Sequence, residues 1–202
     1  MSVTQLIPQR IGESQMIVEP RLGKTMFEDL IRKPNGHEYK FFSWGTTKNI
    51  RPVMVLPLTE EGNIVAVEQY REAADQLIIE VPGGNPKGNQ TDEEVARAEL
   101  LEEAGMEWNT LILLTPKRIF WEPASLRISF TSYLAFGCRK VQEPKPDKNE
   151  FIALHEFPLP KWLEMIYLGE VTDPKTIVTT ILAMRHLGIT FNIPPIFNFN
   201  KG

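Results

Sequence analysis

The sequence predicts an α+β fold with a small antiparallel β-sheet in its N-terminal part. Two observations support this prediction. Runs rich in β-branched and aromatic residues, separated by turns containing glycine or proline, fill much of the first 81 residues and return after residue 110. A capped helical pattern begins at residue 91, and further helical patterns begin at residues 159 and 174, the second of them capped by Asp173. Strand hairpins combined with a few helices indicate an α+β domain.

Composition limits the class of protein. A chain of 202 residues, 42% hydrophobic and 24% charged, has room for one domain with an appendage. The net charge of −4 argues against a partner such as a nucleic acid or a membrane surface. Cys138 is the single cysteine, so no internal disulfide can form and a reducing compartment is expected. The N-terminus does not resemble a signal peptide, and no 18-residue apolar run occurs, so we expect a soluble, cytoplasmic protein.

The first 48 residues are predicted to form a small β-sheet with a loosely held N-terminal segment. Residues 1–14 show no periodicity and are expected to be loosely held. Strands are predicted at 16–19, 24–32 and 37–44, with turns at 21–23 and 34–36. Such a small sheet needs something to pack on. Phe41, Phe42 and Trp44 provide an aromatic surface, and packing is the simplest explanation for them.

The rest of the chain predicts further strands and two late helices. A hairpin is expected across the turn at 60–62, and a polar surface loop at 141–150. Asp173 is a predicted N-cap, and Gly188 is predicted to end the last helix. The tail is apolar, contains Pro194-Pro195, and is expected to lie extended against the body or a partner chain. The predicted strands are 51–59, 63–70, 77–81, 111–121, 127–136 and 151–156, and the predicted late helices are 159–168 and 174–187.

One strand–loop–helix unit organises the chain. The apolar run at 77–81 ends in Pro82-Gly83-Gly84, which predicts a strand followed by a loop. Thr91 and Glu94 form a capping box that predicts the start of a helix. Gly105 is placed as the left-handed residue just past the helix end.

Three carboxylates share one face of this helix. Glu99, Glu102 and Glu103 stand at i, i+3 and i+4, and no lysine or arginine lies between them. A solvated acidic face would be the ordinary explanation. The neighbouring apolar residues and the glycine loop favour a second one, because clustered hard oxygen ligands without a countercharge suit Mg²⁺ or Mn²⁺.

The segment from Gly84 to Met106 resembles the box of the Nudix family, G-x5-E-x7-R-E-U-x-E-E-x-G-U, where U is aliphatic. Every fixed position after the arginine matches. Gln90 replaces the box glutamate and Ala98 the box arginine, two side chains that pair in the family. Because both are replaced, no charge is left without its partner. The resemblance implies an α/β/α sandwich with a mixed β-sheet.

The resemblance extends to one branch, the ADP-ribose and nucleoside-diphosphate-sugar pyrophosphatases, over roughly residues 24–188. Gln69-Tyr70-Arg71 is similar to a strand end whose arginine grips a substrate phosphate, and residues 80–84 to E-x-P-A-G, in which the residue at Gly83 lends a carbonyl to metal. Residues 146–151 resemble the loop that carries the catalytic base, and 173–177 the last-helix signature. Around Pro123, Glu122 and Ala124 depart from the branch's S-P-G turn.

The resemblance implies a division into a dimerisation sheet at 1–48, a Nudix hydrolase domain at 49–190 and an extended tail at 191–202. It implies a homodimer acting on a small nucleoside diphosphate derivative with Mg²⁺ or Mn²⁺. The implied metal ligands are Glu99, Glu102, Glu103 and the Gly83 carbonyl, with Glu102 and Glu103 also at the catalytic centre. Glu150 is the preferred base and Asp147 the second choice, although either can be an ordinary solvated acid. The implied substrate-binding residues are Arg71, Glu80 and Phe41, the last stacking on the base.

Three functions remain open at this point. The first is hydrolysis of the pyrophosphate bond of ADP-ribose or an ADP-sugar, releasing a nucleoside monophosphate. The second is a Nudix-fold module that binds nucleotides without cleaving them, suggested by Gln90, Ala98 and Glu122. The third is hydrolysis of another nucleotide such as a GDP-sugar. The intact Glu99, Glu102 and Glu103 favour an enzyme.

Overall fold

The structure, a computed structural model, describes residues 7–19, 23–47, 50–147 and 150–190. The predicted tail at 191–202 lies outside the described residues, as does most of the predicted turn at 21–23. The chain forms two compact units. Unit 1 comprises Met1–Val53, Gly83–Glu99 and Lys117–Thr131, and unit 2 comprises Met54–Pro82, Leu100–Pro116 and Ser132–Gly202.

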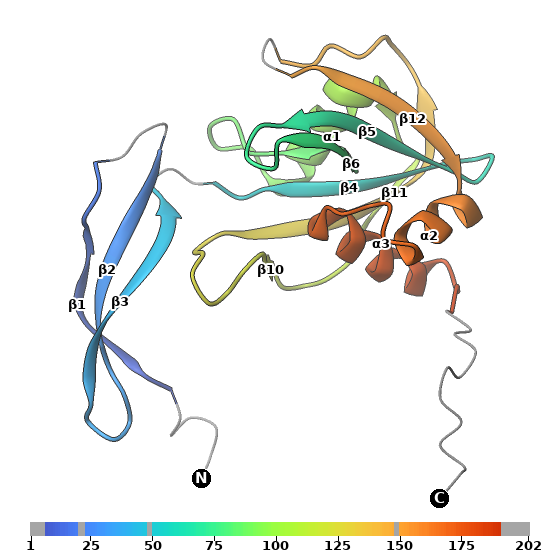
Figure 1. Ribbon diagram of the computed structural model, residues 1–202. Helices are drawn as coiled ribbons and strands as arrows, with labels where there is room; N and C mark the ends of the chain where they lie inside the picture. The colour runs from blue at the N-terminus through green and yellow to red at the C-terminus, as the bar shows by residue number, and fades with distance from the viewer. Residues whose placement is uncertain (1–6, 20–22, 48–49, 148–149, 191–202) are drawn as a thin grey trace, which may run out of the picture. The chain divides into compact units, whose positions relative to one another are not determined.

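Figure 1 labels most of the helices and strands. The strands are β1 (Gln9–Met16), β2 (Lys24–Arg32), β3 (Glu38–Thr46), β4 (Val53–Thr59), β5 (Asn63–Arg71), β6 (Gln76–Glu80), β7 (Gly83–Gly84), β8 (Met106–Glu107), β9 (Thr110–Leu113), β10 (Ile119–Phe120), β11 (Ser129–Lys140) and β12 (Ile152–Pro158). The helices are α1 (Asp92–Ala104), α2 (Leu159–Tyr167) and α3 (Pro174–His186).

Unit 1 contains a separate antiparallel sheet of order β1-β2-β3. The predicted strand at 24–32 matches β2 at both ends, and Gly36 takes a positive φ in the predicted turn. The expectation of a loose arm at 1–14 is wrong for residues 9–14, which belong to β1. Polar residues fill much of β1, so its sequence carries no apolar alternation, yet its backbone still pairs with β2.

Arg127 takes the place of an apolar core in this sheet. Its guanidinium donates hydrogen bonds to Ser14 of β1 at 2.8 Å, Asp29 of β2 at 2.5 Å and Ser43 of β3 at 2.7 Å. It also lies over the Phe27 ring, 4.1 Å from the centroid. One side chain therefore binds all three strands. The fully buried positions of these strands are polar or glycine: Thr25, Asp29, Ser43 and Gly45.

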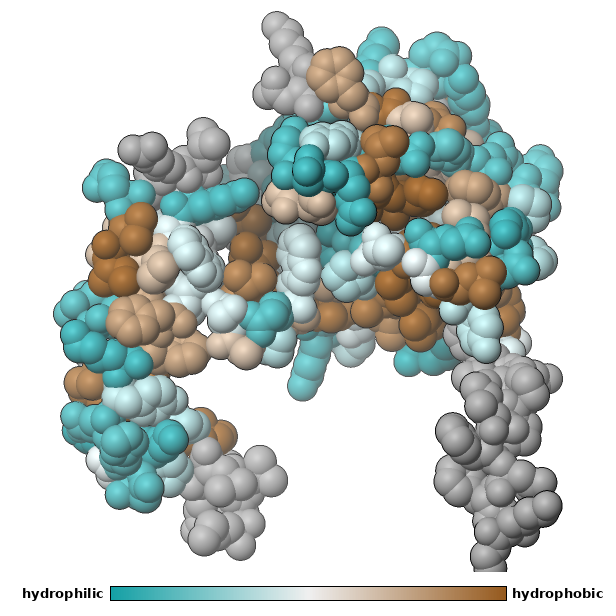
Figure 2. Space-filling model, viewed as in Figure 1, coloured by the Kyte–Doolittle hydropathy of each residue, from teal (hydrophilic) through white to brown (hydrophobic). Residues whose placement is uncertain are grey.

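Hydrophobic side chains are exposed on unit 1 as well. Phe42 and Trp44 of β3 are each about half exposed. Figure 2 shows several hydrophobic side chains among polar ones on the viewed face of the β1–β3 sheet. The aromatic surface predicted for this part of the chain is therefore only partly used in packing.

Unit 2 is built on a sheet in which β11, β4, β5 and β12 are neighbours in that order. β6 pairs with β5, and β8 and β9 pair with β11. All seven residues of β4 are buried, as expected for a central strand with a continuous apolar sequence. The predicted hairpin between β4 and β5 is present, and Gly62 takes a positive φ in its turn.

The single long strand predicted at 111–121 is wrong. The chain forms β9 and β10 instead, in different units, with residues 114–118 between them outside any strand. Pro116 lies in this break, and proline has no N–H to donate to a ladder. The sequence does not predict the short strand β8, because two residues are too few for a periodic signal.

The helices match the prediction closely. Thr91 and Glu94 form the expected capping box, with hydrogen bonds of 2.8 and 3.2 Å between each backbone N–H and the other side chain, and Gly105 has a φ of 66° just past α1. In unit 2, α2 and α3 lie along one face of the sheet (Figure 1), where Trp162 of α2 donates to Thr180 of α3 at 3.0 Å. No helix in the described ranges is long and apolar enough to cross a membrane. The predicted α+β class, with a mixed sheet and a separate small antiparallel sheet, is confirmed.

The ion pairs of unit 1 make its stability depend on pH. Burial raises the pKa of Asp29, but the hydrogen bonds from Ser14 and Arg127 and the charges of Arg127 and Arg10 outweigh it and hold the pKa below its ordinary value. The stabilisation is therefore complete above the unfolded-state pKa of about 3.9 and is lost as pH falls through the lower folded-state pKa.

We predict that Asp29→Asn lowers the free energy of unfolding at pH 7 by on the order of 2 kcal/mol, because Arg127 loses its buried anionic partner. The difference from wild type should shrink as pH falls from about 5 to about 2. Urea melts at each pH measure it. The control is Glu28→Gln, which removes the partner of the exposed Lys40 and should cost less than about 1 kcal/mol. An Asp29→Asn deficit that does not change with pH would show that the charge of Asp29 does not stabilise the sheet.

Candidate active site

The candidate active site of unit 2 is centred on a pair between Arg71 and Glu80. Arg71 ends β5, and its Nε and Nη2 donate to the two carboxylate oxygens of Glu80 at 2.8 and 2.5 Å. The Glu80 side chain is 5% exposed, whereas the Arg71 side chain is 43% exposed. The pair thus fixes the plane of a guanidinium while part of it still faces solvent, an arrangement suited to a two-point contact with phosphate.

Further negative charge acts on Arg71. The hydrogen bond to Glu80 raises the pKa of the guanidinium above its ordinary value against the effect of burial. The charges of Glu80, Glu103 and Asp173 act in the same direction. Glu103 therefore acts electrostatically on a cation that lies outside its own helix. The sequence of the helix could not indicate this cation, because it comes from β5.

The glutamates of α1 differ in burial. Glu103 is 3% exposed and Glu99 is 9% exposed, while Glu102 is half-buried. Taking two carboxylates out of water is costly unless cations or hydrogen-bond donors compensate. A purely solvated acidic face, the alternative explanation for these residues, does not describe Glu99 and Glu103.

In unit 1, the Glu99 carboxylate packs against the glycine loop. A Cβ added to Gly84 would lie 2.2 Å from Glu99 Oε1, so only glycine leaves room for this carboxylate. Gly83 and Gly84 form the short strand β7. The glycine loop and the helix are therefore in contact at Glu99.

The donor set fits a hard divalent cation in kind. Carboxylate oxygens and a backbone carbonyl are the ligands that Mg²⁺ and Mn²⁺ prefer, and Glu99, Glu102, Glu103 and Gly83 supply them. Within the described ranges, no three acidic, histidine or cysteine side chains converge closely enough to enclose an ion.

The loop residues Asp147 and Glu150 are hydrogen-bonded to each other. Glu150 accepts a hydrogen bond from the Asp147 N–H at 3.0 Å, and its own N–H donates to the Asp147 carbonyl at 2.8 Å. The segment before Asp147 is attached to the end of α1. Lys145 N–H donates to the Glu102 carbonyl at 2.7 Å, and Val141 N–H donates to the Gly105 carbonyl at 2.9 Å. These bonds bring the start of the loop beside the helix end that carries Glu102.

The changed box positions have a different brace in unit 1. Arg118 Nη1 lies 2.8 Å from Asp92 Oδ2 at the start of α1, and Arg51 lies 3.6 Å from the other carboxylate oxygen. Arg51 also donates to the Gln90 carbonyl at 2.9 Å, while the Gln90 side chain accepts from Lys87 N–H at 2.7 Å. Loop and helix are thus held by Asp92 and two arginines, without the family's Glu–Arg pair. No local sequence signal points to Arg118 in this role.

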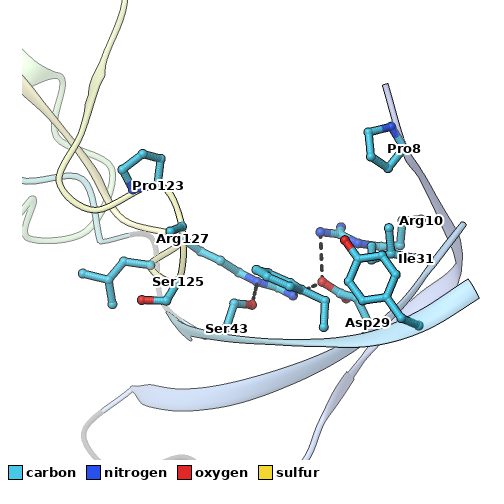
Figure 3. Close-up of a pocket in the computed structure, with 12 residues that line it drawn as sticks. Pro8, Arg10, Asp29, Ile31, Ser43, Pro123, Ser125 and Arg127 are labelled. Atoms are coloured by element: carbon cyan, nitrogen blue, oxygen red, sulfur yellow. Dashed lines mark hydrogen bonds and ion pairs between the residues drawn. The ribbon is translucent and has the colours of Figure 1, made fainter. Parts of the chain in front are cut away.

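Phe41 lines a pocket in unit 1 with a volume of about 280 Å³. Figure 3 shows the Arg10 and Arg127 side chains directed at Asp29 in this pocket. Arg10 lies 3.2 Å from the Asp29 carboxylate. The pocket therefore combines a ring, a buried acid and two guanidinium groups.

The N-terminus of α3 contacts the strand end that carries Glu80, and the sequence did not indicate this contact. Asp173 caps the helix as predicted, accepting from Thr176 N–H at 2.9 Å and from the Thr176 hydroxyl at 2.8 Å. Lys175 Nζ lies 2.5 Å from the other Asp173 oxygen, with its side chain 10% exposed. The Thr176 hydroxyl accepts from the N–H of Val81, the residue after Glu80, at 2.9 Å.

Several known proteins are similar to this chain in sequence or in fold. The NUDIX domain matches residues 48–174. A methanol dehydrogenase activator of Bacillus methanolicus is 27% identical over 175 residues, covering 86% of this chain and 91% of that protein. An ADP-ribose pyrophosphatase of Bacillus subtilis (strain 168) is 28% identical over 152 residues, covering 75% of this chain and 80% of that protein.

Among solved structures, an ADP compounds hydrolase superposes with a TM-score of 0.77 at 17% identity, covering 90% of this chain and 94% of that one. At this identity the likeness concerns the fold. The sequence match spans well over half of the chain. It includes the two strands that end in Arg71 and Glu80, the glycine loop with Gly84, and the helix with the three glutamates. The chain belongs to the Nudix hydrolase family.

Proposed function

We propose that this protein hydrolyses the pyrophosphate bond of a nucleoside diphosphate linked to another moiety, with ADP-ribose or an ADP-sugar as substrate and a nucleoside monophosphate as product. The observation that carries the proposal is the burial of Glu99 and Glu103 on one helix, with the Glu99 carboxylate seated against Gly84. Carboxylates on one helix beside a glycine loop are hard oxygen donors of the kind that Mg²⁺ and Mn²⁺ prefer. The similarity to an ADP-ribose pyrophosphatase supports the choice of substrate.

Each site residue has a proposed role. Arg71 binds a substrate phosphate through the exposed part of its guanidinium, and Glu80 holds that guanidinium in place. Nudix hydrolases generally use divalent metal ions. Glu99, Glu102, Glu103 and the Gly83 carbonyl would hold Mg²⁺ or Mn²⁺, which neutralises the diphosphate charge and lowers the pKa of a bound water.

Glu150 is the proposed general base, with Asp147 second. A base must come within hydrogen-bond reach of the attacking water. The bonds that tie 141–145 to the end of α1 support a position near the glutamates. In the structure the Glu150 carboxylate already serves as a hydrogen-bond acceptor, since it accepts from the Asp147 N–H.

Phe41 and the sheet at 1–48 have a proposed part in binding and assembly. The pocket around Phe41 combines an aromatic ring with two guanidinium groups, which suits a base. We propose that Phe42 and Trp44, each half exposed, pack in a homodimer. The main domain would then span 49–190 and the tail 191–202. The single cysteine supports a reducing compartment such as the cytoplasm.

A nucleotide-binding module without hydrolysis is the second candidate. The similarity to a methanol dehydrogenase activator favours it, since that name describes an effect on another enzyme. A third candidate is hydrolysis of a different nucleotide such as a GDP-sugar. Substrate turnover distinguishes all three.

We expect purified protein with magnesium or manganese to release AMP from ADP-ribose or an ADP-sugar, and a chelator to stop the reaction. A panel of nucleoside diphosphate derivatives, followed by chromatography of the products, tests this. Faster turnover of a GDP-sugar would favour the third candidate. No turnover of any compound, with nucleotide binding retained, would favour the binding module.

Gly84→Ala should weaken metal binding while leaving the stability of the metal-free fold nearly unchanged. The new Cβ would displace the Glu99 carboxylate, the far end of a flexible side chain, so the metal-free melting temperature should change by less than about 4 °C. The added stability from magnesium, which grows with concentration over Kd, should fall sharply. Melts with and without magnesium measure both, and Glu99→Gln is the matched comparison. Equal magnesium shifts in wild type and Gly84→Ala would remove Glu99 from the ligand set.

Glu150→Gln should lower kcat by about two to four orders of magnitude with little change in substrate binding, as expected for a lost general base. Asp147→Asn is the matched control in the same loop and should lower kcat much less. Steady-state kinetics and ADP-ribose binding decide between them. If Asp147→Asn abolishes turnover and Glu150→Gln does not, the roles are reversed.

A further inference from the structure

Hydrogen bonds and one peptide link connect the N-terminus of α3 to the proposed phosphate-binding arginine. Asp173 Oδ2 accepts from the Thr176 hydroxyl at 2.8 Å, and that hydroxyl oxygen accepts from Val81 N–H at 2.9 Å. Val81 directly follows Glu80, whose carboxylate binds Arg71 at 2.8 and 2.5 Å. All five residues belong to unit 2.

Thr176, the central residue of this set, is buried, and the Val81 N–H has no other acceptor available from water. Thr176 is 0% exposed and Val81 is 1% exposed, so water cannot replace the hydroxyl as the acceptor of the Val81 N–H. The hydroxyl has one proton to donate, and Asp173 Oδ2 receives it. The donor and acceptor roles of Thr176 are therefore both defined.

An ion pair holds the Asp173 end of this set of contacts in place. Lys175 Nζ lies 2.5 Å from Asp173 Oδ1, and both side chains are almost fully buried. Asp173 is thus held by a cation on one oxygen and by the Thr176 hydroxyl and N–H on the other. A carboxylate held on both oxygens gives the threonine a fixed acceptor.

We infer that Thr176 is a positioning residue for the reaction: it fixes the peptide after Glu80, and through the Glu80 carboxylate it sets the orientation in which Arg71 meets substrate phosphate. The inference rests on the proposed function, because it needs Arg71 to bind phosphate. It assigns to the start of α3 a role beyond capping. The negative charge of Asp173 also acts on Arg71, which places this helix end within electrostatic range of the guanidinium.

The test compares two buried threonines of the same helix. Thr176→Val keeps the side-chain shape and removes the acceptor of Val81 N–H. Thr180→Val is the matched control. Thr180 is 1% exposed and accepts a hydrogen bond from Trp162 Nε1 at 3.0 Å. Thr180 and Trp162 also belong to unit 2, and in the described structure neither is bonded to Glu80 or Arg71. Both changes leave one buried N–H without its acceptor, and Thr176→Val also removes the hydroxyl donor to Asp173, so both should lower the melting temperature and Thr176→Val should lower it more.

We expect Thr176→Val to raise the KM for ADP-ribose about tenfold with kcat within about threefold of wild type, because Arg71 contributes binding in ground and transition states alike. Thr180→Val should leave KM unchanged. Thr176→Ser, which keeps the hydroxyl, should restore KM to within about twofold. If Thr176→Val yields no folded protein, Thr176→Cys replaces it, since a thiol is a weak acceptor and should give an intermediate rise.

A double-mutant cycle tests whether Thr176 acts through Arg71. In an Arg71→Lys background, which keeps a cation beside Glu80 but loses the two-point fork, Thr176→Val should raise KM by less than about threefold. A full tenfold rise there, or equal KM values for Thr176→Val and Thr180→Val, would overturn the inference.

Binding separates this inference from the proposed function. If wild type binds ADP-ribose without cleaving it, the proposed reaction fails, and the Kd measured by calorimetry replaces KM in the same comparison. A tenfold weaker Kd for Thr176→Val alone then still supports positioning by Thr176. A wild-type chain that neither binds nor cleaves ADP-ribose or any related nucleotide overturns both.

Discussion

Carboxylates that are removed from water determine much of how this chain is arranged. Asp29, Glu80 and Asp173 are each at most 5% exposed, and each lies against an arginine or lysine of its own unit. A buried carboxylate without such a partner would cost several kcal/mol. The positions of Arg127, Arg71 and Lys175 are therefore dictated by acids, and the hydrophobic core of β4, β5 and the late helices supplies the framework that holds the two pairs of unit 2.

Elements whose signals are local were predictable from the sequence. The capping box at Thr91, the N-cap at Asp173 and the hairpin glycine at 62 each depend on contacts within a few residues, and all three are present. β1 was not predictable by periodicity, because the sheet it joins buries an ion-pair cluster in place of alternating apolar residues. The division of the strand predicted at 111–121 could have been foreseen at Pro116, since a proline inside an apolar run argues against a continuous strand.

The candidate site follows the same distinction. A motif was enough to propose Arg71, Glu80, Gly83 and the three glutamates as site residues. It could not indicate that Arg71 and Glu103 act on one another, or that Thr176 touches the peptide after Glu80, because those relations join β5, α1 and α3 across the fold. The altered box shows the same limit. Gln90 and Ala98 alone suggested only that a pair was missing, whereas Arg118 and Arg51 at Asp92 form a different brace.

The small sheet of unit 1 has an unusual thermodynamic character because Arg127 holds its three strands. Its fully buried strand positions are Thr25, Asp29, Ser43 and Gly45, so its melting exposes little apolar surface. The heat capacity of unfolding rises with apolar exposure and falls with polar exposure. The free energy that holds this sheet together should therefore follow a flatter curve against temperature than that of unit 2, whose core is apolar. Added salt would weaken the sheet through its exposed charges, such as Arg10.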